Sequence, residues 1–107
     1  MEGLEQISFE IISTVGTARS CYIEAIYEAK KGMFDQAEAL IKEGNTYFTQ
    51  GHHVHTQLIQ KEASGEAIVM NVLLTHAQDQ LMSAEGFKII AVEMIDLYRE
   101  IFKLKNK

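Results

Sequence analysis

The chain has 107 residues, a formal net charge of −5 and one cysteine. This length predicts a single domain over residues 1–107, and the acidic balance argues against a nucleic-acid binder, which would need a basic surface. Because Cys21 has no partner for a disulfide within the chain, we expect a reducing, cytoplasmic location. The sequence contains no run of about 18 consecutive apolar residues, so we expect no membrane span. Met1–Gln6 lacks the basic start and apolar core of a signal peptide.

Proline is absent from the sequence, which favours a few long helices joined by few turns. Apolar residues recur at steps of three and four from the start of the chain, so we predict a first helix over residues 4–31. This stripe consists of Leu4, Ile7, Ile11, Val15, Ala18, Tyr22, Ala25 and Ala29. Lys30-Lys31-Gly32 is a typical helix end. Gly16 costs the helix about 1 kcal/mol relative to alanine. Its presence is explained either as a tolerated irregularity or by the close approach of another helix.

A second helix is predicted from about Met33-Phe34-Asp35 to Lys61 or Ala63, with a weaker stripe and a polar middle. Its stripe consists of Ala37, Leu40, Ile41, Gly44, Phe48, Gly51, Leu58 and Ile59. The segment Ala63-Ser64-Gly65-Glu66 is predicted to turn the chain into a third helix.

The third helix is predicted over residues 69–104, with a length of about 50 Å. One apolar stripe consists of Met70, Leu74, Ala77, Leu81, Ala84, Ala91, Ile95, Tyr98 and Phe102. An adjacent stripe consists of Phe87, Ile90, Met94, Leu97, Ile101 and Leu104. Together they form an apolar face wider than one seam needs, so we expect a homo-oligomer to bury part of it. Lys103, Lys105 and Lys107 place positive charge at the negative end of the helix.

His76 and Asp79 stand out in the third helix because they place an imidazole and a carboxylate in an otherwise apolar run. Residues three apart lie on roughly one face of a helix. We therefore expect the chemistry of the protein at this pair.

The segment around the pair resembles a known active-site motif. Residues 76–82 read H-A-Q-D-Q-L-M, similar to the H-x-Q-D-x-L-M segment of the enzyme IIA component of the lactose/cellobiose (N,N'-diacetylchitobiose) family of the bacterial phosphoenolpyruvate-dependent sugar phosphotransferase system. Residues 16–20, G-T-A-R-S, are similar to the family's G-x-A-R-S, and residues 31–35, K-G-M-F-D, to its G-[DN]-[FY] connection with one extra residue. Residues 55–59, H-T-Q-L-I, resemble its H-x-x-Q-T-x-L-I region with a different spacing. In this order, the pieces cover nearly the whole chain.

This resemblance implies an all-α fold, an up-down-up bundle of three long helices that assembles as a homotrimer. It implies that His76 accepts a phosphoryl group from the phosphocarrier protein HPr, as a tele-phosphohistidine, and passes it to the IIB component of a sugar permease. Asp79 would meet its symmetry mates near the trimer axis and bind a divalent cation such as Mg²⁺, one per trimer. The sugar touches only the permease, and the residues around Thr56 and His76 lean toward cellobiose or chitobiose rather than lactose.

Histidine suits a phosphoryl relay because its imidazole is both a nucleophile and a good leaving group. The ring must be neutral to attack, which a reference pKa of about 6.5 makes common at pH 7. The transition state needs in-line positioning and donors for the phosphoryl oxygens. Gln78, Gln80 and the ring N–H of a neighbouring residue are candidate supporting donors, and the sequence does not choose among them. No glycine-rich phosphate loop is present, which fits a relay without ATP.

Asp79 lies on a mainly apolar stretch, where an unpaired carboxylate would be costly to bury. Three such carboxylates would repel one another until one or more took up a proton. A hard cation with oxygen ligands removes both problems. The alternative is an ordinary hydrogen-bonded polar residue.

His52, His53 and His55 form an H-H-x-H cluster that invites a metal-site interpretation. On a helix, however, residues 52 and 55 share a face while residue 53 points elsewhere, and structural zinc usually needs four ligands. We favour a polar helix face, one of whose histidines could still line the phosphate site.

Two other functions stay open at this point. A two-component histidine-phosphotransfer domain is also a helical relay, but it is expected to carry H-x-x-K-G after the histidine, where this chain has Ala77-Gln78-Asp79-Gln80. A non-catalytic oligomerisation module would use His76 only as a structural residue.

Overall fold

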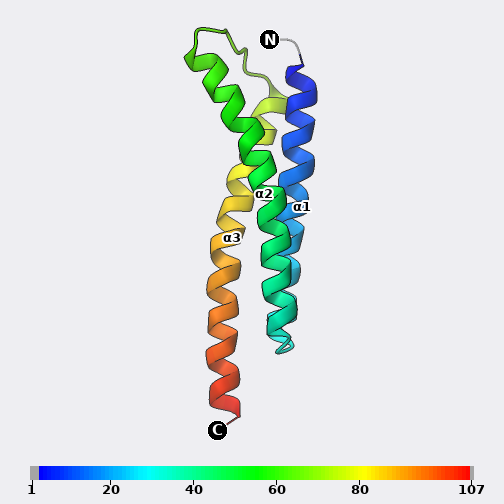
Figure 1. Cartoon of the computed structure of the whole chain (residues 1–107), viewed down its shortest axis with the longest axis vertical. Helices are drawn as coiled ribbons and strands as arrows, with labels where there is room; N and C mark the ends of the chain where they lie inside the picture. Colours follow the sequence, from blue (N-terminus) through cyan, green and yellow to red (C-terminus); the bar gives the residue numbers. More distant parts are fainter. Residues whose placement is uncertain (1–2, 107) are drawn as a thin grey trace.

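The computed structural model describes residues 3–106 as three helices that run lengthwise in alternating directions (Figure 1). Helix α1 spans Leu4–Lys30, α2 spans Phe34–Ala63 and α3 spans Val72–Lys105. The structure measures 61 × 20 × 19 Å, and α1 packs along both other helices, which contact each other less. The prediction of an all-α, up-down-up bundle is confirmed.

Met1, Glu2 and Lys107 lie outside the described residues, so the expectations about the first residues and the last lysine are only partly covered. Lys103 and Lys105 do occupy the last turn of α3. Within residues 3–106, no helix combines the length and the apolar character needed to cross a membrane.

The turn between α1 and α2 is built on Gly32, which adopts a left-handed conformation with φ 78°. The Gly32 N–H donates to the carbonyl of Ala29 at 3.0 Å, and the Met33 N–H donates to that of Glu28 at 2.9 Å. These two bonds form a Schellman motif, which needs a residue without a Cβ penalty at this position. Gly65, with φ 105°, ends α2 with the same pair of bonds. Both predicted turns are confirmed.

The predicted start of α3 at Val69 is wrong, because the helix begins at Val72. Asn71 is its N-cap: the residue is extended, with φ −145° and ψ 175°, and its side-chain oxygen accepts a hydrogen bond from the Leu74 N–H at 2.8 Å. Such a cap satisfies a backbone donor that the first turn leaves free. Val69 is 73% exposed. The apolar pattern in the sequence therefore starts before the first residue of the helix.

The core forms where α1 lies between α2 and α3. Its members from the predicted stripes are Ile11, Val15, Ala18, Tyr22, Ala25, Ala29, Ala37, Ile41, Leu58, Leu74, Ala77, Leu81, Ala84, Ala91 and Ile95. Ile59 and Met70 were also predicted in stripes but are each 53% exposed. Ile59 belongs to the last turns of α2 and Met70 to the connection that follows it, and this end of α2 leans away from α1 (Figure 1).

A second face of α3 stays exposed in the single chain. We call it the outer α3 face; it consists of Val72, Asp79, Met82, Ile90, Leu97, Ile101 and Leu104. Its apolar members are 44% to 87% exposed. Four of them belong to the second predicted stripe, so the expectation that a single chain leaves part of this surface exposed agrees with the structure.

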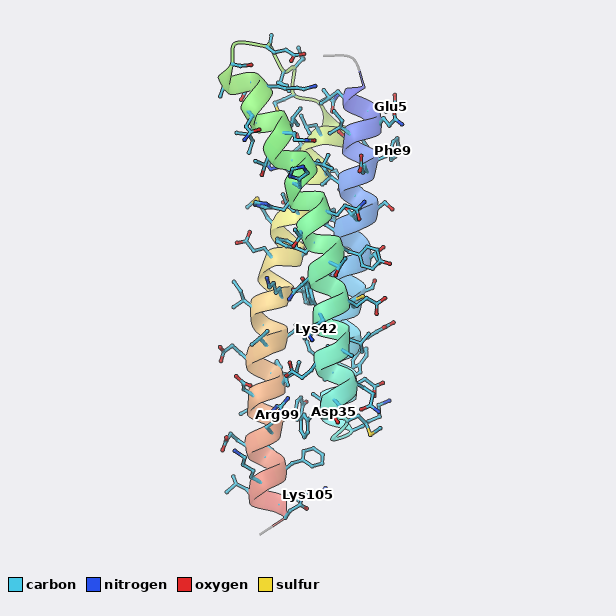
Figure 2. All side chains as sticks on the ribbon, viewed as in Figure 1. Glu5, Phe9, Asp35, Lys42, Arg99 and Lys105 are labelled. Carbon is cyan, nitrogen blue, oxygen red and sulfur yellow. The ribbon has the colours of Figure 1, made fainter. Side chains whose placement is uncertain are left out.

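Arg99, in the C-terminal half of α3, contacts residues at the start of α2 (Figure 2). Its guanidinium carbon lies 5.0 Å from the ring centroid of Phe34, and its Nη2 donates to Glu38 at 2.8 Å. The ring of Phe102 meets Phe34 edge to face at 5.5 Å. These contacts hold α3 where it runs past the α1–α2 turn (Figure 1).

Candidate active site

His76 and Asp79 lie side by side at the start of α3, and both are exposed. Together with Met70, Asn71, Val72 and Thr75 they line an open hollow of about 530 Å³. The Thr75 hydroxyl donates to the Asn71 carbonyl at 2.8 Å, which adds to the Asn71 cap and fixes the first turn. The expectation that the pair shares one face is met, and a protein partner can reach the imidazole from solvent.

Gln78 lies on a different side of α3 from His76, since two residues span about 200° around a helix. Its amide Nε2 is 3.1 Å from Nε2 of His55 on α2, so a neutral His55 accepts a hydrogen bond from the amide. Burial, and then the nearby charge of His52, lower the pKa of His55 below its usual value. Both effects favour the neutral ring that this contact requires.

Gln80 lies one turn beyond His76 on the same side of α3. Its Oε1 accepts a hydrogen bond from Nη1 of Arg19 on α1 at 3.2 Å, and the Arg19 guanidinium carbon lies 5.4 Å from the ring centroid of Phe87. In the sequence, Arg19 is part of the G-T-A-R-S motif, which by itself predicts no role for the arginine. One signal was available: Arg19 is the only basic residue between Leu4 and Ala29.

The three clustered histidines of α2 have three different neighbours. His52 stacks on Phe48 with ring centroids 6.0 Å apart, and His53 lies 3.4 Å from the amide of Gln57. Of the three, His55 is the one whose ring nitrogen lies within hydrogen-bond distance of a side chain of α3, the helix that carries His76. Over residues 3–106, no three His, Cys, Asp or Glu side chains of one chain lie close enough together to hold a metal ion.

Comparison with known proteins identifies the family. Residues 6–99 match the family model described as "PTS system, Lactose/Cellobiose specific IIA subunit". The chain belongs to this family. The resemblance inferred from residues 76–82 and the other motifs is thereby confirmed.

Relatives match this enzyme IIA chain over almost its full length. The oligo-beta-mannoside-specific EIIA component of Bacillus subtilis is 45% identical over 102 residues, which is 95% of this chain and 89% of the relative. The crystal structure of the cellobiose-specific enzyme IIA from Bacillus anthracis superposes with a TM-score of 0.93 at 42% identity, covering 96% of this chain and 94% of that one. A solution structure of the IIA(chitobiose)–HPr complex of Escherichia coli gives a TM-score of 0.79 at 30% identity, covering 94% and 98%.

Family membership makes the chain a component of a sugar phosphotransferase system, and it favours the relay interpretation over both alternatives. The fold of the single chain is also that of the solved relatives, and it places His76 on a helical turn of α3 rather than on a loop.

Proposed function

We propose that this enzyme IIA chain carries a phosphoryl group on His76, accepts it from HPr and passes it to the IIB component of a sugar permease. The observation that carries this proposal is an exposed histidine on a capped, rigid turn of α3, in a chain of this family. A relative of the same fold has been solved in complex with HPr, which supports HPr as the donor.

The chemistry requires only a neutral imidazole and correct positioning. The lone pair of Nε2 attacks phosphorus in line, so that a P–N bond forms as the bond between phosphorus and the donor breaks. Imidazole leaves readily in the next transfer, which preserves the transfer potential. Because α3 fixes the backbone of His76, partners rather than this chain must move to align the donor and the acceptor.

We further propose that three copies assemble through the outer α3 face. Six of the seven residues that define this face are apolar, Asp79 being the exception, and exposed apolar surfaces of such length are uncommon on monomers. Each chain would bring the exposed carboxylate of Asp79 to the axis, so three copies would supply an all-oxygen set that suits Mg²⁺. The ion would neutralise the clustered carboxylates and takes no part in phosphoryl transfer.

The transported sugar belongs to the permease. Curated relatives are named for oligo-beta-mannoside, lichenan and lactose. We propose a β-linked disaccharide or short oligosaccharide of the cellobiose or chitobiose class, and the genes that flank the coding sequence will test this.

The test of the carrier function uses labelled phosphoenolpyruvate, enzyme I and HPr. Wild-type chain should gain acid-labile, base-stable label, and His76→Ala should gain none. His53→Ala is the matched control, because this histidine is exposed on α2 and its ring nitrogen lies next to Gln57 of the same helix. Label retained in His76→Ala would reject this residue as the acceptor, and an unlabelled wild type would reject the function.

A further inference from the structure

Arg19 has no part in the relay described above, yet it lies against the helix that carries His76. Its side chain is partly buried between α1 and α3, with Nη1 3.2 Å from Oε1 of Gln80 and Cζ 5.4 Å from the centroid of Phe87. A guanidinium held by both a hydrogen bond and a ring has little freedom to turn. Arg19 therefore fixes the atoms it touches.

The contact with Arg19 decides which way the Gln80 amide faces. A guanidinium has only donors, so Gln80 must present its carbonyl oxygen to α1. The NH₂ group of the same amide is then turned away from Arg19. Residues four apart on a helix have Cβ atoms about 5–6 Å apart, so a phosphoryl group on His76 lies within reach of this amide.

Gln78 is less suited to the same task. Its amide is engaged by His55 on α2, and it leaves α3 in a direction about 200° from that of His76. Of the two glutamines, Gln80 is therefore the one with both the direction and the orientation of a donor to His76.

We infer that Arg19 is a positioning residue for phosphoryl transfer: it holds Gln80 so that the amide N–H donates to a phosphoryl oxygen on His76. The inference deepens the proposed carrier function and rests on it. The hydrogen bond from a charged donor also polarises the amide, which strengthens its N–H as a donor. Only the phosphorus changes partners in the step, and neither Arg19 nor Gln80 gains or loses a proton.

The test measures transfer from labelled phospho-HPr by rapid quenching. Arg19→Met and Gln80→Met should each lower the saturating rate about ten-fold. This is less than the roughly 100-fold expected at least for a donor in an enclosed oxyanion hole, because the hollow beside His76 is open to solvent. The KM for phospho-HPr should stay within about two-fold, since the lost interaction acts in the transition state. The double variant should be no slower than either single variant, because the two residues act as one unit.

Two further variants separate positioning from stability. Gln80→Glu keeps an acceptor for Arg19, and so keeps the contact between α1 and α3, but it offers no donor to the phosphoryl group. We expect it to lose as much rate as Gln80→Met. Arg99→Met is the matched control, because Arg99 also stacks on a phenylalanine and bonds across helices, at the far end of α3. It should lower the thermal midpoint and leave the transfer rate unchanged.

The inference is overturned if Arg19→Met transfers at the wild-type rate, or if the two losses multiply in the double variant. Arg99→Met slowing transfer as much as Arg19→Met would overturn it as well, since a general loss of stability would then explain both. A wild type that takes no label would instead contradict the carrier function, and with it this inference.

Discussion

Consecutive side chains of α3 have different surroundings, because a helix sends each residue in a new direction. His76 and Asp79 face solvent, Gln78 reaches α2 and Gln80 reaches α1. Gln78 and Gln80 therefore connect the segment that carries His76 to both neighbouring helices. Any change to one of the two glutamines alters a contact between helices as well as a group near the imidazole.

His55 makes one of the few links between α2 and α3, and this link depends on pH. Its pKa is lowered in the folded chain by burial and by His52, so the unfolded chain binds the proton more readily. The stabilisation is then complete above the unfolded pKa of about 6.5 and is lost as pH falls from there through the lower folded pKa. Protonation also removes the lone pair that accepts from Gln78.

We expect the urea midpoint of the wild type to fall between pH 7.5 and pH 5 more steeply than that of His55→Gln. The glutamine keeps an acceptor for Gln78 and does not titrate. Both proteins should be compared at one protein concentration, because assembly shifts apparent stability. Equal slopes for the two proteins would show that His55 does not contribute to the acid sensitivity.

At the scale of the helices, the glycines of α1 and α2 differ in how much space surrounds them. A Cβ on Gly51 would lie 2.5 Å from Oγ1 of Thr14 and 2.6 Å from Cγ1 of Val15. At Gly16 no atom outside its own helix lies within 4 Å of such a Cβ. Of the two explanations for Gly16 left open by the sequence, the close approach of a helix is therefore absent there within one chain and present at Gly51.

We expect Gly51→Ala to destabilise the chain by about 1–3 kcal/mol, because overpacking outweighs the gain in helix propensity. Gly16→Ala should instead stabilise it by up to about 1 kcal/mol. Thermal unfolding followed by circular dichroism measures both. A gain in stability for Gly51→Ala would show that α1 and α2 can separate at low cost.

The stripes and turns were predictable because each depends on neighbours within a few residues. Helix period fixed the buried side of α1, and Gly32 and Gly65 marked the two helix ends. The start of α3 was missed because the apolar pattern runs through Val69, whereas the Asn71 cap depends on one side-chain hydrogen bond. Arg19 and Gln80 are 61 residues apart, so only packing brings them together.

At the scale of the whole molecule, the outer α3 face is the apolar surface that the single chain leaves exposed. Asp79 is the one charged residue among those that define this face, and Leu97 lies on the same side of the helix five turns later. If three copies meet there, three Asp79 carboxylates face one another and need a cation, whereas three Leu97 side chains simply pack. The two positions therefore predict opposite responses to substitution.

Asp79→Leu should abolish bound metal but keep the trimer, because it replaces three repelling charges with apolar contact. Leu97→Lys should reduce the mass in solution to that of one chain, 12.1 kDa, because it buries three like charges without partners. Tyr27→Lys is the control: this side chain is 56% exposed on α1 and should leave the mass unchanged. Light scattering gives the mass, and elemental analysis gives the metal content.

The metal assignment fails if Asp79→Leu retains the metal content of the wild type. The proposed assembly is rejected if Leu97→Lys keeps the wild-type mass, or if the wild type itself is a monomer.

Labelling of His76 in the Asp79→Leu trimer tests whether Asp79 also affects phosphoryl transfer. Because the ion neutralises carboxylates and touches no phosphoryl oxygen in the proposed step, label should transfer at close to the wild-type rate. A large loss of rate in an intact trimer would mean that Asp79 acts on the histidine three residues away, and the separation of chemistry from assembly along α3 would have to be abandoned.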